Sequence, residues 1–113
     1  MEVGIDIVEV PRFQRAVERH GERLLLRLFT DRELAYARAA PPPLAVQRLA
    51  ARFAAKEAFF KARGRPVPFR ELEIVHRGRK PVLLFRGAPY PVSLSHTPTA
   101  AVAVVVIEGP TPR

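Results

Sequence analysis

The sequence contains no cysteine, so it can form neither a disulfide framework nor a thiolate metal site. It also lacks any apolar run near the ~18 residues that a membrane span needs. Its first residues, MEVGIDIVEV, carry acids where a secretory signal peptide has basic residues. These absences predict a cytoplasmic protein.

Motifs of several common enzyme classes are missing as well. No glycine-rich loop of the nucleoside-triphosphate or dinucleotide type occurs in the chain. No serine stands in a context that resembles the nucleophile elbow of a Ser–His–acid hydrolase. Any chemistry therefore rests on other residues.

Acidic residues are few: 11 Asp and Glu stand against 19 Lys and Arg, which gives a formal charge of +8. Such an excess favours anionic partners, which include nucleic acid, phosphorylated small molecules and acidic proteins. With 48% hydrophobic and 27% charged residues, the 113-residue chain is typical of one globular domain, residues 1–113.

The pattern of residues predicts helices in the first half of the chain. A strand is expected over residues 3–10, followed by a helix that stops at Gly21 and a second helical piece over 21–29. The segment TDRE (30–33) is a capping-box pattern that opens a short helix to about Arg38. Three prolines at 41–43 end it, and a long helix is expected over 44–63.

The second half of the chain alternates apolar strands with turn residues. Strands are expected over residues 70–77, 81–86, 92–96 and 100–108. The last of them, AAVAVVVIE, is apolar throughout and is expected to be a central, buried strand. The whole predicts an α+β domain, in which an N-terminal strand and helices pack on an antiparallel β-meander, with a frayed tail over 109–113.

Glu57 and Lys61 stand four residues apart among alanines and phenylalanines of the long helix. One interpretation is a simple helical ion pair worth a few tenths of a kcal/mol. Asp6 favours another, because an acid inside an apolar strand costs free energy unless it is paired or binds a metal. Asp6 and Glu57 offer the oxygen ligands that Mg²⁺ prefers, and Lys61 would then face the same phosphates. The spacing alone leaves both interpretations open.

Other polar residues give weaker indications. The long helix carries a basic stripe that is expected to be a solvated face, formed by Arg48, Arg52, Lys56 and Arg63. His96 closes a strand among small hydroxyl residues, as a turn residue or as part of a site. His20 and His76, flanked by charges, are expected to be exposed and without a role.

Three segments occur in the order GIDIVEVPRF, RFAAKEAFFKA and VSLSHT, over residues 4–13, 52–62 and 92–97. With TDRE and the GRKP turn at 78–81, they resemble the holo-acyl-carrier-protein synthases, the small trimeric members of the 4′-phosphopantetheinyl transferases. KEAFFKA (56–62) is the most specific part. The resemblance implies that family's fold and the transfer of 4′-phosphopantetheine from coenzyme A to a serine of apo acyl carrier protein, releasing adenosine 3′,5′-bisphosphate.

The same resemblance implies roles for individual residues. Asp6 and Glu57 would be the ligands of Mg²⁺, with Mn²⁺ as the alternative, and Lys61 would neutralise charge on the transferred phosphoryl group. A metal-held water or Glu57 itself would accept the serine proton. The residues that would contact coenzyme A are Arg48, Arg52, Lys61, Ser95, His96 and Thr97.

The resemblance also implies two protein partners. A basic helix with Arg12, Arg15 and Arg19 would meet the acidic carrier protein. The chain would form a homotrimer with active sites at subunit interfaces, where Asp6 and Glu57 come from one chain and His96 from its neighbour.

One loop departs from the family pattern and keeps alternatives open. Between Gly64 and Phe69, the segment RPVP replaces a longer loop of the Gly-Thr-Gly type. A homologue that binds coenzyme A or carrier protein without catalysis is one alternative. A basic nucleic-acid-binding module is another, with an affinity that falls steeply with salt and does not depend on Asp6 or Glu57.

Overall fold

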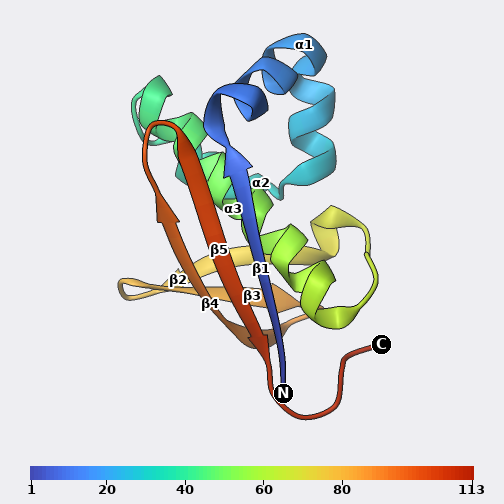
Figure 1. Cartoon of the computed structure of the whole chain (residues 1–113). Coiled ribbons are helices and arrows are strands. Elements are labelled where there is room, and N and C mark those ends of the chain that lie inside the picture. The colour runs from blue at the N-terminus through green and yellow to red at the C-terminus, as the bar shows by residue number, and fades with distance from the viewer.

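Helices cover one face of a five-stranded antiparallel sheet in the computed structural model, which describes all residues 1–113 (Figure 1). The strand order is β1-β5-β4-β3-β2, so the apolar strand β5 is interior, as predicted. The elements are β1 (Glu2–Glu9), α1 (Val10–Leu28), α2 (Asp31–Arg38), α3 (Pro42–Arg63), the single turn η1 (Phe69–Glu71), β2 (Leu72–Arg77), β3 (Lys80–Phe85), β4 (Ala88–His96) and β5 (Ala100–Ile107). The predicted α+β class is confirmed.

The helical half follows local sequence signals closely. Gly21 breaks α1 with φ 62° and ψ −147°, a conformation that only glycine adopts readily, so the helix continues in a new direction as predicted. Thr30 and Glu33 form the expected capping box at the start of α2. The helix α3 begins at Pro42 rather than at residue 44, because proline fits the first turn, where its missing N–H is not needed.

Two expectations for the second half are wrong. The expected strands at 81–86 and 92–96 leave a five-residue turn over 87–91, but the chain reverses within Arg86 and Gly87, both with positive φ, and β4 already begins at Ala88. Pro89 and Pro91 are tolerated there because this part of β4 pairs only with β3, and pairing with β5 starts at Val92.

The chain end after β5 is held by arginines rather than frayed. Arg63 donates from Nε to the carbonyl oxygen of Pro112 at 3.0 Å, and Arg86 donates from Nη1 to that of Arg113 at 2.9 Å.

The expectation of a fully solvated basic stripe on α3 is also wrong. Lys56 is 0% exposed and Arg52 only 3%. Lys56 finds polar partners in the interior, and Arg52 stacks its guanidinium 4.2 Å from the ring centroid of Tyr36.

None of the helices combines the length and apolar character needed to cross a lipid bilayer.

The strand β1 lies directly against α3, which brings the N-terminal part of the chain onto the middle of the long helix (Figure 1). Gly4 allows this close approach. A Cβ placed on Gly4 would overlap the carbonyl oxygen of Ala58 and lie 2.8 Å from the backbone nitrogen of Ala62. Both are backbone atoms that cannot rotate away, so any side chain at position 4 has to push β1 off the helix.

We therefore expect Gly4→Ala to lower the free energy of unfolding by about 1–3 kcal/mol, the usual cost of overpacking a tight contact. Gly78→Ala is the control, because Gly78 has a positive φ but nothing within 4 Å of its added Cβ. Its cost is limited to backbone strain, about 1–2 kcal/mol. Urea denaturation measures both. The NMR titration of Glu57 described below separates them, because only Gly4→Ala displaces Asp6 and so changes the pKa of Glu57. Unchanged stability in Gly4→Ala would contradict the contact.

Candidate active site

Three charged side chains meet where β1 crosses α3. Asp6 lies two residues after Gly4 and so points to the same, helix-facing side of the strand. Lys61 donates from Nζ to Asp6 Oδ1 at 2.9 Å and to the carbonyl oxygen of Ile5 at 3.0 Å. Lys61 therefore pairs with Asp6 across the two elements. The alternative interpretation, a simple helical ion pair between Glu57 and Lys61, is not what the structure shows.

Glu57 is half-buried beside this pair. Burial raises the pKa of the Glu57 carboxyl above its ordinary value, the negative charge of Asp6 raises it further, and Lys61 opposes both effects. A carboxylate whose ionisation is disfavoured by burial and by a neighbouring carboxylate marks a place where a bound cation is favourable.

The donors fit a divalent metal of the Mg²⁺ type. Asp6 and Glu57 supply carboxylate oxygens, the ligands this ion prefers, and they form a pair rather than a cluster of three or more possible ligands. Mg²⁺ is commonly held by one or two carboxylates, with waters and phosphate oxygens completing the shell. Two carboxylates at the edge of an open cleft suit that arrangement.

A cleft of about 600 Å³ opens next to the two carboxylates. Asp6 and Glu57 lie in its wall, together with Arg12 and Arg27 from the two halves of α1. Most of the remaining lining is apolar and comes from α1, α3 and η1: Phe13, Ala16, Leu24, Leu28, Phe53 and Phe69. The arrangement places carboxylates, cations and an apolar surface around one space.

A second hollow of about 500 Å³ adjoins the cleft through Leu24 and Arg27. Its other lining residues are cationic or titratable and belong to α1: Arg19, His20 and Arg23. Sequence reasoning identified Arg12, Arg15 and Arg19 but missed Arg23 and Arg27. Their spacing of four residues in GERLLLRLF, on the polar side of an apolar helix, was the available signal.

Of the basic residues expected at coenzyme A, Arg48 and Arg52 lie apart from Glu57. At about 100° per residue, position 48 is on the opposite side of α3 from position 57. Arg48 donates to the carbonyl oxygen of Tyr36 at 3.1 Å, and Arg52 donates from Nη1 to that of Arg48 at 3.4 Å. Burial lowers the pKa of the Arg52 guanidinium, whose Nε and Nη2 have no hydrogen-bond partner. Within one chain these two arginines and the carboxylates therefore form separate groups.

The segment Ser95–Thr97 ends β4 at the N-terminal part of α3. His96 lies 2.9 Å from Gln47 through Nδ1 and Oε1, and its ring is exposed. Ser95 is exposed and points to the opposite face of the sheet, because neighbouring strand residues alternate. The Thr97 hydroxyl accepts hydrogen bonds from the backbone N–H groups of Thr99 and Ala100, so it stabilises the turn into β5.

Comparison with known proteins assigns the chain to a class. The sequence profile of the 4′-phosphopantetheinyl transferase superfamily matches residues 2–106. The chain belongs to this superfamily, and the predicted enzyme class, phosphopantetheinyl transferase, is confirmed.

Within the superfamily, the similar proteins are holo-acyl-carrier-protein synthases, which confirms the resemblance found in the sequence. The holo-[acyl-carrier-protein] synthase of Thermus thermophilus is 41% identical over 116 residues, covering 94% of this chain and 91% of that protein. The crystal structure of the enzyme from Neisseria meningitidis superposes with a TM-score of 0.83 at 31% identity and covers 96% of this chain and 98% of that one. The enzyme from Bacillus anthracis, solved in complex with CoA (3′,5′-ADP), has a TM-score of 0.78 at 33% identity, with 92% of each chain covered.

The charges of Asp6 and Lys61 act on Glu57 in opposite directions, which predicts the effect of removing each one. Asp6→Asn should lower the pKa of Glu57, because the neighbouring anion that disfavours ionisation is gone. Lys61→Met should raise that pKa, because the favourable cation is gone. Titration of the Glu57 carboxyl carbon by NMR in metal-free buffer measures both midpoints. Shifts in the same direction for the two variants would contradict this account of the site.

Proposed function

We propose that this chain transfers 4′-phosphopantetheine from coenzyme A to a serine of apo acyl carrier protein, in an Mg²⁺-dependent reaction that releases adenosine 3′,5′-bisphosphate. The observation that carries the proposal is the meeting of Asp6, Glu57 and Lys61 at one edge of the cleft, in a chain of this superfamily. The structure of the Bacillus anthracis relative with CoA (3′,5′-ADP) supports coenzyme A as the donor.

The serine oxygen attacks the phosphorus bonded to pantetheine. A new P–O bond forms to serine, the P–O bond of the pyrophosphate breaks, and adenosine 3′,5′-bisphosphate leaves with the electron pair. Lys61 is placed to offset the charge on this group, since its exposed ammonium already lies beside Asp6 at the cleft. Glu57, whose raised pKa favours proton uptake relative to an ordinary glutamate, is our candidate for the group that receives the serine proton.

Asp6 and Glu57 would also hold the divalent ion. When bound there, the ion polarises the phosphoryl oxygens and stabilises the leaving phosphate. Both carboxylates have to be ionised to bind it well, so the raised pKa of Glu57 predicts that metal affinity falls as the pH is lowered toward that pKa.

The cleft and the basic surface of α1 would receive the carrier protein. The apolar wall with Phe13, Phe53 and Phe69 suits an apolar side chain, and Arg12 and Arg27 flank it with positive charge. Arg15 and Arg19 extend that charge along α1, and neither takes part in an ion pair within the chain. An acidic partner fits such a surface and would be steered to it by the charge of +8.

A homotrimer is proposed from the open face of the sheet. Val3, Ile5 and Ile7 of β1 are 55%, 58% and 69% exposed, on the face that α3 does not cover. A continuous row of exposed β-branched residues on a strand is typical of an interface. In a trimer, His96 and Arg48 of one chain would complete the coenzyme A site around the carboxylates of its neighbour, whereas Arg52 is buried against Tyr36 and is not expected to reach it. The cytoplasmic location also stays a prediction.

The short RPVP loop does not by itself favour a binding-only homologue. Arg63 donates from Nη1 to the carbonyl oxygens of Arg65 and Pro66, at 3.2 and 3.3 Å, and so orders the loop. No feature of this loop removes any of the three charged groups at the cleft. We therefore propose that the chain catalyses the transfer. The transfer assay below would reveal a homologue that only binds.

Incubation with apo acyl carrier protein, coenzyme A and Mg²⁺ should add one phosphopantetheine, seen as a gain in the intact mass of the carrier protein. EDTA should abolish the gain. Asp6→Asn and Glu57→Gln should each lower kcat/KM by about 10²-fold or more, as expected for groups that act on the charge of the transition state. Glu108→Gln, at an exposed residue after β5 that does not line the cleft, is the matched control and should act like the wild type.

Two results would overturn this assignment. If transfer continues in EDTA and both carboxylate variants stay active, the proposal that Asp6 and Glu57 hold a required divalent ion is wrong. Coenzyme A binding by calorimetry without transfer to any of several carrier proteins would favour the binding-only homologue. Salt-sensitive binding of DNA or RNA that both carboxylate variants retain would favour the nucleic-acid module instead.

The shared site is testable by mixing inactive chains. His96→Ala and Glu57→Gln should each be nearly inactive alone. Refolded together in equal amounts, they should regain about a quarter of wild-type activity, because one interface in four would pair an intact Glu57 with an intact His96. Sedimentation equilibrium should give a trimer. A stable monomer, or a mixture as inactive as its parts, would contradict the shared site.

A further inference from the structure

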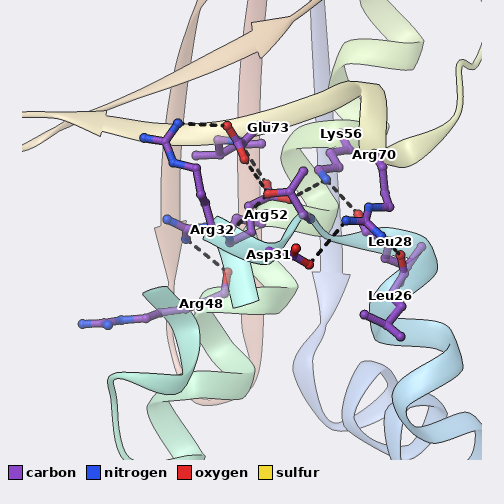
Figure 2. Close-up of polar contacts among 12 residues, drawn as sticks. Leu26, Leu28, Asp31, Arg32, Arg48, Arg52, Lys56, Arg70 and Glu73 are labelled. Atoms are coloured by element: carbon purple, nitrogen blue, oxygen red, sulfur yellow. Dashed lines mark hydrogen bonds and ion pairs between the residues drawn. The ribbon is translucent and has the colours of Figure 1, made fainter. Parts of the chain in front are cut away.

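Lys56 is a buried cation that the proposed reaction does not use. It lies in α3 directly before Glu57, yet its side chain is fully buried, whereas the Lys61 side chain is exposed beside Asp6. Its Nζ donates to the carbonyl oxygen of Leu28 and to Glu33 Oε1, both at 2.7 Å. Figure 2 shows the Lys56 ammonium reaching away from α3 toward Leu28 at the end of α1.

Both carboxylate oxygens of Glu33 accept hydrogen bonds. Its Oε1 also accepts the backbone N–H of Thr30, and its Oε2 accepts that of Ile74 in β2, each at 2.9 Å. A buried ion pair of this kind seldom adds net stability, because desolvation offsets the attraction, but it does specify one geometry. The pair joins the end of α1, the start of α2, the middle of α3 and the strand β2.

The bond to Leu28 matters for the cleft. The second half of α1, after the kink at Gly21, supplies Leu24, Arg27 and Leu28 to the cleft wall, opposite Glu57 on α3. Lys56 places its charge on the last carbonyl of that helix, where a cation is favourable. Arg70 adds a longer bond, 3.4 Å, to the carbonyl oxygen of Leu26 (Figure 2). The second half of α1 is thereby bonded to Lys56, the residue that precedes Glu57.

We propose that Lys56 is a positioning residue: its bond to Leu28 holds the α1 wall of the cleft at a fixed place relative to Glu57, and so prepares the surface that receives the carrier protein. The inference rests on the proposed function. It assigns to the KEAFFKA segment a second cation whose task is separate from that of Lys61. Coenzyme A and the divalent ion, which meet Asp6, Glu57 and Lys61, do not depend on this bond.

The test is the double variant Lys56→Met/Glu33→Gln, which removes both charges of the pair, so that neither partner remains as an unpaired buried ion. KM for apo acyl carrier protein should rise about tenfold or more, a loss of ~1.4 kcal/mol, while KM for coenzyme A stays within about twofold. Leu83→Ala is the control, because Leu83 is fully buried in β3 and does not line the cleft. It should lower the stability and leave both KM values unchanged.

A folded double variant that keeps the wild-type KM for carrier protein overturns the proposal. So does an equal rise in the Leu83→Ala control, which would mean that any loss of stability has this effect. Thermal unfolding of each variant establishes that it is folded.

Hydrogen exchange of the unmutated protein tests the same bond if the double variant does not fold. The amide of Phe29, bonded to the Leu25 carbonyl at 2.9 Å, should exchange as slowly as the amides of the sheet core. Exchange faster by about a hundredfold would show that the end of α1 frays locally and is not held, which overturns the proposal. This measurement needs no activity, so failure of transfer by the wild type would count against the proposed function and not against the role of Lys56.

Discussion

The contact between Gly4 and the backbone of α3 is the constraint on which the site depends. Without a side chain at position 4, β1 rests on the helix at Ala58 and Ala62. Asp6, two residues further along the strand, then reaches the part of α3 that carries Glu57 and Lys61. Burial raises the pKa of Glu57, and the negative charge of Asp6 raises it further. The fold therefore holds an arrangement that a cation can stabilise.

The two lysines of α3 have different surroundings and different roles. Lys56 and Lys61 are five residues apart, about 140° around the helix axis, so their side chains leave the helix on different sides. Lys56 is enclosed and bonded to Glu33 and Leu28, while Lys61 is more than half exposed beside Asp6. The buried pair orders the helices around the cleft, and the exposed lysine is free to meet an anion.

Much of the fold could be read from the chain because its signals are local. The capping box at Thr30, the break at Gly21 and the apolar strand β5 each depend on a few neighbouring residues. The burial of Lys56 and Arg52 could not be predicted, since it depends on Glu33, Leu28 and Tyr36, which are distant in sequence. The strand character of Pro89 and Pro91 was missed for a similar reason: it depends on which side of β4 lacks a partner.

By itself, the sequence determined the α+β class, the order of the elements and the family, because residue periodicity, turn residues and the KEAFFKA segment are properties of the chain. It also named Asp6, Glu57 and Lys61 as candidates, without deciding which of them pair. Only the tertiary structure decided that Lys61 bonds to Asp6 rather than to Glu57, and that Arg27 lines the cleft. The physical reason is distance in the sequence: Asp6 and Lys61 are 55 residues apart, and the contact between β1 and α3 is set by packing at Gly4.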